Sequence, residues 1–417
     1  LGTNVTSTAQ PLPGRRYEYG YDHIGNRQWA NRTGVISLRD DYTANSLNQY
    51  VTRENNTVSI SGTADASAVV AVNGRNVTAG RQGKFWSNEV TVSNVLNAWR
   101  GPISVYATKP SGGNALLRLD SRTAQTAAVL ENFTYDLDGN MLSDGLWNYR
   151  WDGENRLTRM ETTTVAQSVG VPHRILEFRY DYLSRRVQKR VINGTLSQEV
   201  SSRRFVYEGW NLIAEYTAPG GSSFGGIVRT FTWGLDIARS LSDSGGVGAL
   251  VQLADHATGK TFIPTYDGNG NIASMVNASS GSLAAAYEYS PYGEALRVDV
   301  VDVALADQPF RFSTKWTDDE TGLVYYGRRF YDPRNGRFVG RDPIREKGGP
   351  NLYGFCRNDG INRWDVLGKY YRMVEDDKSI TFIVPIFIQN GPGNSDVALQ
   401  MIGNMLSQWS GTVDGKK

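Results

Sequence analysis

Short stretches in which aromatic and polar residues alternate recur along the chain, and each ends in a turn-forming sequence. Residues 133–136, 149–152 and 178–181 each carry two aromatic residues two positions apart, followed by aspartate. Side chains two positions apart on a strand point to the same face of a sheet, so the rings should share one face. The aspartate can accept hydrogen bonds from turn amides, and a nearby glycine or asparagine tolerates positive φ. Each stretch therefore predicts a β-hairpin.

The same pattern extends over most of the chain. Tyr-Asp pairs at 21–22 and 266–267 lead into Gly-Asn turns, and Asn193-Gly194 separates two strand-like runs between residues 186 and 200. A single hairpin cannot cover its own aromatic face, so successive hairpins should pair edge to edge into one continuous sheet. Because the spacing is irregular, we expect a sheet that curls rather than a regular stack. The pattern predicts an all-β fold.

Residues 57–108 depart from this pattern. They alternate apolar and small polar residues, turn at Asn73-Gly74 and contain no Tyr-Asp pair. This segment predicts a small inserted β-sandwich of the immunoglobulin-like kind. Both a binding role and a role as a spacer or plug are consistent with it.

The segment from residue 370 onward has a different character. Residues 381–384 favour a strand, and residues 395–409 have helical spacing with Ser395 or Asp396 as the N-cap. The apolar face of this helix would consist of Val397, Met401, Ile402, Met405 and Leu406. A short α+β segment after a long β region indicates the start of a separate domain.

Composition narrows the class of protein. A length of 417 residues exceeds the usual size of one compact core, so more than one unit is expected. A formal net charge of +2, with no Lys/Arg run, argues against nucleic-acid binding. Cys356 is the one cysteine, which excludes an intrachain disulfide, and it should be a packed thiol. Three scattered histidines and the absence of cofactor motifs predict neither a metal nor a cofactor.

No run of residues reaches the length of about 20 apolar residues that a transmembrane helix needs. The longest candidate, residues 380–388, is the length of a strand. The chain begins at Leu1 rather than methionine, and we therefore expect it to be an internal piece of a longer polypeptide.

Residues 325–368 combine dense aromatics, clustered glycines and two separated aspartates, in the sequence YYGRRFYDPRNGRFVGRDPIREKGGPNLYGFCRNDGINRWDVLG. This block resembles the core-ending signature of Rhs/YD-repeat proteins, and the upstream units resemble the YD repeats of Rhs proteins, toxin-complex shells and teneurins. The resemblance implies a spiral β-shell that encloses and releases a toxin. It also implies a secreted or cell-surface bacterial protein. The implied partners are its own C-terminal cargo, a delivery apparatus and an immunity protein.

Pattern and resemblance together divide the chain into five parts. We expect YD-repeat shell strands at 1–56, the inserted β-sandwich at 57–108, further YD-repeat shell at 109–324, an Rhs core-associated closing segment at 325–369 and the start of a variable cargo domain at 370–417. In the closing segment, the rings of Tyr325, Tyr326, Phe330 and Tyr331 should pack the last turn of the spiral.

The resemblance also points to a site in the closing segment. Asp342 opens Asp-Pro-Ile-Arg, and Asp365 opens Asp-Val-Leu-Gly, 23 positions later. In Rhs proteins, two Asp-Pro-x-Gly motifs at about this separation form an aspartic-protease-like pair that cuts the chain just after the second motif. Carried over by position, the cut falls between Lys369 and Tyr370. The composition of the chain changes at the same point.

Two carboxylates can hydrolyse a peptide bond. Held close together they cannot both ionise, so one stays protonated. The charged carboxylate activates water, and the neutral one donates a proton to the scissile carbonyl or the leaving nitrogen. Arg341, next to Asp342, would tune the pair or stabilise the oxyanion. Effective molarities of about 10⁵–10⁸ M for tethered groups make modest catalysts sufficient for a single turnover.

The chain departs from the family motif at three positions, because Arg345 replaces the usual glycine, Val366 the usual proline and Lys369 the usual leucine. Asp359 is an alternative partner for Asp342. A second interpretation is that these aspartates only cap turns in a structural plug.

A function of another class also fits the sequence. In a non-catalytic surface adhesin, the insert would bind glycans or proteins and the closing block would only terminate the sheet. The acidic run at residues 318–320 has two interpretations, a calcium site or a solvated turn, and we expect the solvated turn.

Overall fold

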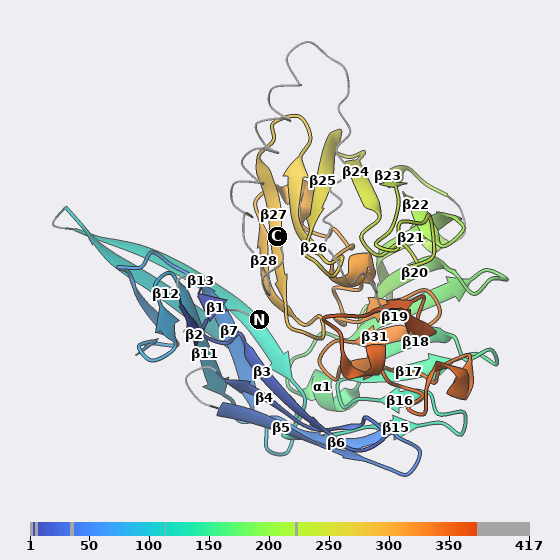
Figure 1. The fold of residues 1–417 in the computed structure, drawn as a ribbon, viewed down its shortest axis with the longest axis horizontal. Helices are drawn as coiled ribbons and strands as arrows, with labels where there is room; N and C mark the ends of the chain where they lie inside the picture. Colours follow the sequence, from blue (N-terminus) through green and yellow to red (C-terminus); the bar gives the residue numbers. More distant parts are fainter. Residues whose placement is uncertain (1–2, 5–6, 34–36, 113, 222–223, 373–417) are drawn as a thin grey trace.

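The computed structural model describes residues 3–4, 7–33, 37–112, 114–221 and 224–372 (Figure 1). Over these residues the chain is mostly β, with large antiparallel sheets, which confirms the all-β prediction. The strand and helix expected at 381–384 and 395–409 lie outside the described residues. The helices within the described ranges are α1 (Thr164–Ser168) and the short 3₁₀ turns η1 (Pro219–Gly221), η2 (Val303–Leu305), η3 (Phe312–Thr314), η4 (Arg345–Gly348) and η5 (Cys356–Asn358). None of them is long and apolar enough to cross a bilayer.

The largest sheet is a meander in which each strand pairs antiparallel with the next strand in sequence. Figure 1 shows it curving around the closing segment, which is drawn in orange and red. In the described part of the chain its fourteen strands are β15 (Thr134–Tyr135), β16 (Met141–Ser143), β17 (Trp147–Trp151), β18 (Leu157–Thr162), β19 (Arg174–Tyr180), β20 (Arg186–Asn193), β21 (Gln198–Glu208), β22 (Asn211–Thr217), β23 (Ile227–Trp233), β24 (Leu250–Asp255), β25 (Lys260–Tyr266), β26 (Ile272–Asn277), β27 (Leu283–Tyr289) and β28 (Ala295–Val300).

A second sheet continues the first. It contains β3 (Arg16–Tyr21), β4 (Arg27–Thr33), β5 (Ser37–Ala44), β6 (Tyr50–Glu54) and β14 (Leu130–Asn132). Strand β14 ends one residue before β15 begins, so a single extended stretch of chain joins the two sheets. A separate small pair, β1 (Thr3–Asn4) and β2 (Ser7–Pro11), precedes them.

Side chains join the first strands of this curl to the last ones. Arg15 Nε lies 2.6 Å from Glu288 Oε1, and the hydroxyls of Tyr21 and Tyr292 are 2.5 Å apart. The ring of Tyr19 meets the ring of Tyr292 edge-on, with centroids 5.0 Å apart. The two sheets therefore curl until their ends meet through side chains.

The aspartate of the Tyr-Asp unit organises its turn in the same way at several places. At Asp181, Oδ1 accepts the backbone N–H groups of Leu183 (3.0 Å) and Arg185 (2.9 Å), and Oδ2 accepts the Arg185 side chain (2.7 Å). The residue four positions after the aspartate thus closes the turn with both its backbone and its side chain. The same arrangement holds for Asp22–Asn26, Asp136–Asn140, Asp152–Arg156 and Asp267–Asn271.

The aromatic residue before that aspartate links neighbouring hairpins. The hydroxyl of Tyr180 donates a hydrogen bond of 2.6 Å to the carbonyl of Leu157, the first residue of β18. The polar tip of a buried ring is thereby satisfied by the adjacent strand. Equivalent bonds join Trp151 to Met141, Tyr207 to Arg186, Trp233 to Leu212 and Tyr289 to Ile272. The Tyr-Asp unit therefore fixes a turn and also holds its strand against the preceding one.

The insert is longer than the predicted residues 57–108, because β13 extends it to Thr126. One sheet holds β10 (Arg81–Gln82), β11 (Phe85–Thr91) and β7 (Thr57–Thr63), and the other holds β13 (Asn114–Thr126), β12 (Trp99–Ser111), β8 (Val69–Val72) and β9 (Arg75–Asn76). Between them lies a core of Val70, Val72, Val77, Trp86 and Ile103. Strand β13 pairs with β12 along its whole length, but most of its side chains are exposed, so its sequence carries little core signal.

The insert interrupts one hairpin of the curled sheet. Strands β6 and β14 are neighbours, with Leu130 directly opposite Glu54. At the base of the insert, Asn94 Nδ2 donates to the carbonyls of Asn55 (2.9 Å) and Ala127 (2.8 Å). A single buried amide therefore ties the strands that enter and leave the insert.

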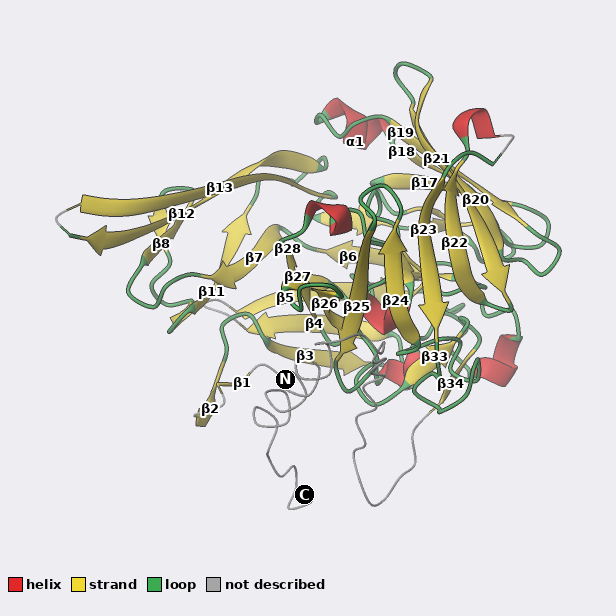
Figure 2. Ribbon diagram, turned by 90° about the horizontal axis from the view of Figure 1, so that it is seen from above, coloured by secondary structure: helices red, strands yellow, loops and turns green. Residues whose placement is uncertain are grey.

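The closing segment lies within the curl of the large sheet. Its strands are β29 (Trp316–Thr317), β30 (Val324–Tyr325), β31 (Phe330–Asp332) and β32 (Arg337–Phe338), followed by the hairpin of β33 (Trp364–Val366) and β34 (Tyr370–Arg372). Figure 2 shows this hairpin beside the end of β23, where Trp364 and Val366 pack against Val247. Its rings are buried as expected, and Cys356 is a packed thiol in the same core, which confirms both predictions.

The closing segment also bonds to the turns along one rim of the curl. The Tyr353 hydroxyl donates to the carbonyl of Gly139 (2.7 Å), and Asn358 Nδ2 donates to that of Gly25 (2.9 Å). These glycines sit in two of the Tyr-Asp turns, so the repeats form the seat on which the closing segment rests.

The expectation of a solvated acidic turn at residues 318–320 is wrong. Asp318 is 1% exposed and receives Arg186 at 2.6 Å and Lys189 at 2.8 Å, both from β20. Although burial acts in the opposite direction, these two cations hold the pKa of Asp318 below its usual value. The other two acids pair as Glu320–Lys189 and Asp319–Arg311. The sequence missed this because the cations lie far away along the chain.

Candidate active site

Asp342 begins a tight turn after β32. Its backbone N–H donates to the carbonyl of Leu352 (2.9 Å), and its Oδ1 accepts the N–H of Ile344 (2.9 Å). The carboxylate is 7% exposed, and its second oxygen, Oδ2, points to a buried guanidinium described below. Within this turn Asp342 therefore caps a backbone group with one oxygen and leaves the other for chemistry.

Asp365 lies in the middle of β33 and is 2% exposed. Strand β33 pairs with β34, with Val366 opposite Tyr370. The two strands are joined by a tight turn in which Leu367 and Gly368 both have positive φ, 60° and 72°. The predicted cleavage bond, from Lys369 to Tyr370, therefore lies where this turn enters β34.

The structure brings Asp342 and Asp365 to the same guanidinium group, that of Arg329 on the loop between β30 and β31. Arg329 Nη2 lies 2.9 Å from Asp342 Oδ2 and 4.0 Å from Asp365 Oδ2. Its Nε donates to the carbonyl of Gly368, and its Nη1 donates to that of Leu352 (3.1 Å). The pair is thus bridged by a cation, which the sequence did not predict.

Lys369 is flanked by both carboxylates. Its N–H donates a hydrogen bond of 3.0 Å to Asp365 Oδ1. Its carbonyl oxygen and Asp342 Oδ2 both lie against Gly348, where a Cβ would come within 3.0 Å and 2.6 Å of them, respectively. Since glycine has no Cβ, this position leaves open the space between Asp342 and the scissile carbonyl.

The electrostatics of the two acids differ. Burial raises the pKa of Asp365 to about 6, with Arg329 opposing the rise and Asp342 adding to it. Burial also raises the pKa of Asp342, but here Arg329 is in direct hydrogen-bond contact and opposes the rise most strongly. The contact favours an ionised Asp342, whereas Asp365 lacks such a bond and is protonated below about pH 6.

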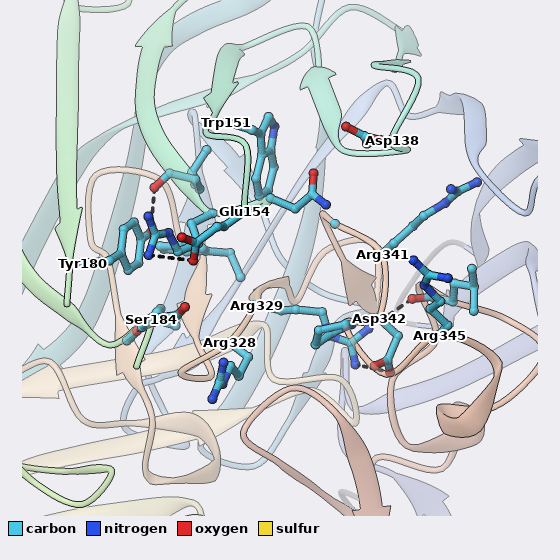
Figure 3. A pocket seen from close by; sticks show the side chains of 18 of the residues that line it. Asp138, Trp151, Glu154, Tyr180, Ser184, Arg328, Arg329, Arg341, Asp342 and Arg345 are labelled. Carbon is cyan, nitrogen blue, oxygen red and sulfur yellow. Dashed lines mark hydrogen bonds and ion pairs between the residues drawn. The ribbon is translucent and has the colours of Figure 1, made fainter. Parts of the chain in front are cut away.

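Asp342 lies on the wall of a pocket of about 580 Å³ (Figure 3). Turn residues of the large sheet, among them Trp151 and Glu154, form the opposite wall. One water in the liquid occupies about 30 Å³, so the pocket is large enough to bring solvent to Asp342. Asp365 does not line it, which leaves the pair with one carboxylate near solvent and one away from it.

Arg341 occupies a different place from the one the sequence suggested. Its side chain lies against Gly139 and the Tyr353 hydroxyl, and Figure 3 shows it pointing away from Asp342. Asp359, the alternative partner, is held instead by Arg363, with 3.6 Å between Oδ2 and Nε. The signal for Arg329 was an arginine within a run of buried aromatics, at the centre of the closing segment.

One departure from the family motif has a clear backbone consequence. Arg345, where the motif has glycine, adopts φ = 55°, a left-handed conformation that glycine accepts without strain. The motif position therefore requires positive φ, and this chain meets the requirement with an arginine.

Comparisons with known proteins place this geometry among toxins. No family model matches the chain. It is 28% identical over 248 residues to the tRNA3(Ser)-specific nuclease WapA of Bacillus spizizenii, covering 58% of this chain and 9% of that protein. It is 28% identical over 249 residues to the double-stranded DNA deaminase toxin A of Burkholderia cenocepacia, covering 57% and 17%. The probable deoxyribonuclease RhsA of Dickeya dadantii is 28% identical over 217 residues, covering 51% and 13%.

The relatives of this chain therefore include Rhs-family toxins, as the sequence indicated. The chain spans 9% to 17% of the length of these three proteins. Among solved structures, the crystal structure of TcdB2-TccC3-Cdc42 aligns over 85% of this chain and 17% of its own, with a TM-score of 0.46 and 17% identity. The Photorhabdus luminescens Tc holotoxin pore carrying the TccC3-D651A mutation aligns over 89% and 17%, with a TM-score of 0.45.

Proposed function

We propose that this chain is the end of an Rhs-type YD-repeat shell, with an immunoglobulin-like insert, that carries a C-terminal toxin and releases it by cutting its own Lys369–Tyr370 bond. The observation that carries the proposal is the position of Lys369, whose N–H bonds to Asp365 while its carbonyl lies beside Asp342 at Gly348. Two acids with different protonation therefore flank the bond that the family motif marks. The cargo begins at residue 370.

The reaction is a hydrolysis. The Asp342 carboxylate takes a proton from a water in the space beside Gly348, and the water oxygen bonds to the carbonyl carbon of Lys369. Protonated Asp365 supplies the proton that the departing nitrogen of Tyr370 needs. The C–N bond then breaks, which leaves a new carboxylate at Lys369 and a new amine at Tyr370. Atoms and charges balance without a cofactor.

The rest of the structure supports a shell that holds its end in place. The closing segment bonds to the Tyr-Asp turns at Gly139 and Gly25, so cutting after Lys369 leaves the segment anchored. The cargo would be freed from the chain while the closing segment stays seated. In this proposal the protein acts outside the producing bacterium, with a delivery apparatus and an immunity protein as partners.

The test is the mass of the purified chain. We expect the folded protein to yield two fragments, the second beginning at Tyr370. Asp342→Asn and Asp365→Asn should each give a single uncut chain with unchanged far-ultraviolet circular dichroism. Asp359→Asn is the matched control, since Asp359 pairs with Arg363 instead, and it should cut normally. An intact Lys369–Tyr370 bond in folded wild-type protein would overturn the proposal and favour the adhesin.

A further inference from the structure

Arg329 is the most completely bonded cation at the site. Its side chain is 3% exposed, and its face packs on Phe338, with 3.7 Å between Cζ and the ring centroid. Three of its nitrogens bond in three directions, to Asp342 Oδ2, to the carbonyl of Leu352 and to the carbonyl of Gly368. These partners belong to the first acidic turn, the loop after it and the turn before the scissile bond.

This set of contacts needs the shape of arginine. A guanidinium is planar and presents its N–H groups in a fixed fork, whereas an ammonium is a point charge that cannot reach three such partners at once. The stacking on Phe338 fixes the plane of the fork. Arg329 therefore sets the distance between the Asp342 turn and the Gly368 turn.

The charge of Arg329 is as significant as its shape. It touches Asp342 and stands 4.0 Å from Asp365, so it stabilises the ionised form of both acids, and of Asp342 more. Burial acts in the other direction on both. The balance keeps one acid charged and one neutral over the same pH range, which is the requirement for a base and an acid working together.

We propose that Arg329, rather than Arg341, is the positioning residue of the aspartate pair: it holds the scissile turn against Asp342 and makes the two carboxylates unequal. The inference rests on the proposed self-cleavage. It assigns to a residue outside both acidic motifs the role that the sequence suggested for the neighbour of Asp342.

The experiment compares Arg329→Met and Arg329→Lys with Arg328→Met. Arg328 is the adjacent residue and lines the same pocket, but it stacks on Trp210 at 4.8 Å, so it is the matched control. Each full-length chain is recovered uncut in denaturant and refolded at a series of pH values. Appearance of the fragment that begins at Tyr370 is followed by mass spectrometry, and the folded fraction by circular dichroism.

Loss of the positive charge raises the pKa of both carboxyls. We expect the cleavage profile of Arg329→Met to move to higher pH by about one unit or more, since an opposite charge at this range lowers a carboxyl pKa by that amount. Arg329→Lys keeps the charge but not the fork, so it should keep the wild-type profile and cut at least about tenfold more slowly. Arg328→Met should match the wild type in both.

A purely structural role for Arg329 would lower the folded fraction and leave the profile of the folded molecules in place, and that result would overturn the proposal. If Arg329→Met does not fold, Arg329→Lys decides: wild-type speed overturns the proposal, and slow cleavage with an unmoved profile supports it. Normal cleavage in Asp342→Asn or Asp365→Asn would instead overturn the proposed function. Failure of the positioning role alone leaves those two variants inactive.

Discussion

The backbone N–H of Lys369 donates a hydrogen bond of 3.0 Å to Oδ1 of Asp365, four residues earlier. An acid whose own turn contains the bond to be cut needs no separate substrate-binding step. Asparagine keeps an oxygen at this position but cannot deliver a proton. The two properties of Asp365, holding the turn and supplying a proton, can therefore be separated by one substitution.

We expect Asp365→Asn to lower the cleavage rate by about 10²-fold or more, which is the usual contribution of a general acid. The β33–β34 hairpin should remain, because the oxygen that accepts the Lys369 N–H is retained. The rate is measured by mass spectrometry after refolding, and the hairpin by amide hydrogen exchange at Lys369. Rapid exchange in the variant would show that the turn, not the proton, had been lost.

Asp365 should also make stability depend on pH. Burial raises its folded pKa from 3.8 to about 6, so the folded state binds the proton more tightly. Its contribution is fully present below about pH 4 and is lost as the pH rises to about 6. At about 1.4 kcal/mol per pKa unit, the loss is about 2–3 kcal/mol.

This pH effect is isolated by difference. Denaturant unfolding of Asp342→Asn, which is expected to stay uncut, is compared with that of the Asp342→Asn/Asp365→Asn double variant between pH 4 and 7. The single variant should lose more stability over this range than the double variant. Parallel curves would contradict the raised pKa of Asp365.

Gly348 should be intolerant of a side chain. A Cβ there would approach Asp342 Oδ2 to 2.6 Å and the Lys369 carbonyl oxygen to 3.0 Å, so one of them has to move. We expect Gly348→Ala to slow cleavage at least about tenfold while the shell stays folded. Gly153→Ala is the control, because a Cβ at Gly153 meets open space and φ there is not positive. Equal rates in the two variants would argue against an active space at Gly348.

The buried ion pairs of Asp318 should matter more for stability than exposed ones. Asp318→Asn leaves Arg186 and Lys189 as buried cations with reduced compensation, and it should destabilise the fold by about 3–5 kcal/mol. Asp302→Asn breaks a pair with the exposed Lys260 and should change stability by less than about 1 kcal/mol. Denaturant midpoints measure both, and similar effects would indicate that the Asp318 cluster is accessible to solvent.

The insert should be removable. Leu130 and Glu54 are directly paired, so Asn-Gly can replace residues 55–129 as a two-residue hairpin turn. We expect the shortened chain to fold and to cut after Lys369 within about twofold of the wild-type rate. Loss of folding would mean that contacts of the insert with the shell, such as Ser61 to the Leu296 carbonyl at 3.4 Å, are needed for the curl.

Local chemistry made much of the fold predictable. The aspartate of each Tyr-Asp unit bonds within its own turn, as Asp181 does with Leu183 and Arg185, so the signal is contained in a few consecutive residues. The limits of the insert were less predictable, because β13 pairs along its length through backbone bonds while most of its side chains stay exposed.

By itself the sequence determined the hairpins, the curled all-β class and two acids at a motif spacing, because all of these depend on nearest neighbours and side-chain alternation. Only the tertiary structure decided what stands between the acids. Arg329 reaches Asp342, Asp365 and the turn before Lys369 from another loop, and Gly348 opens the space beside the scissile carbonyl. These contacts join residues by folding rather than by spacing, so no local pattern in the chain could specify them.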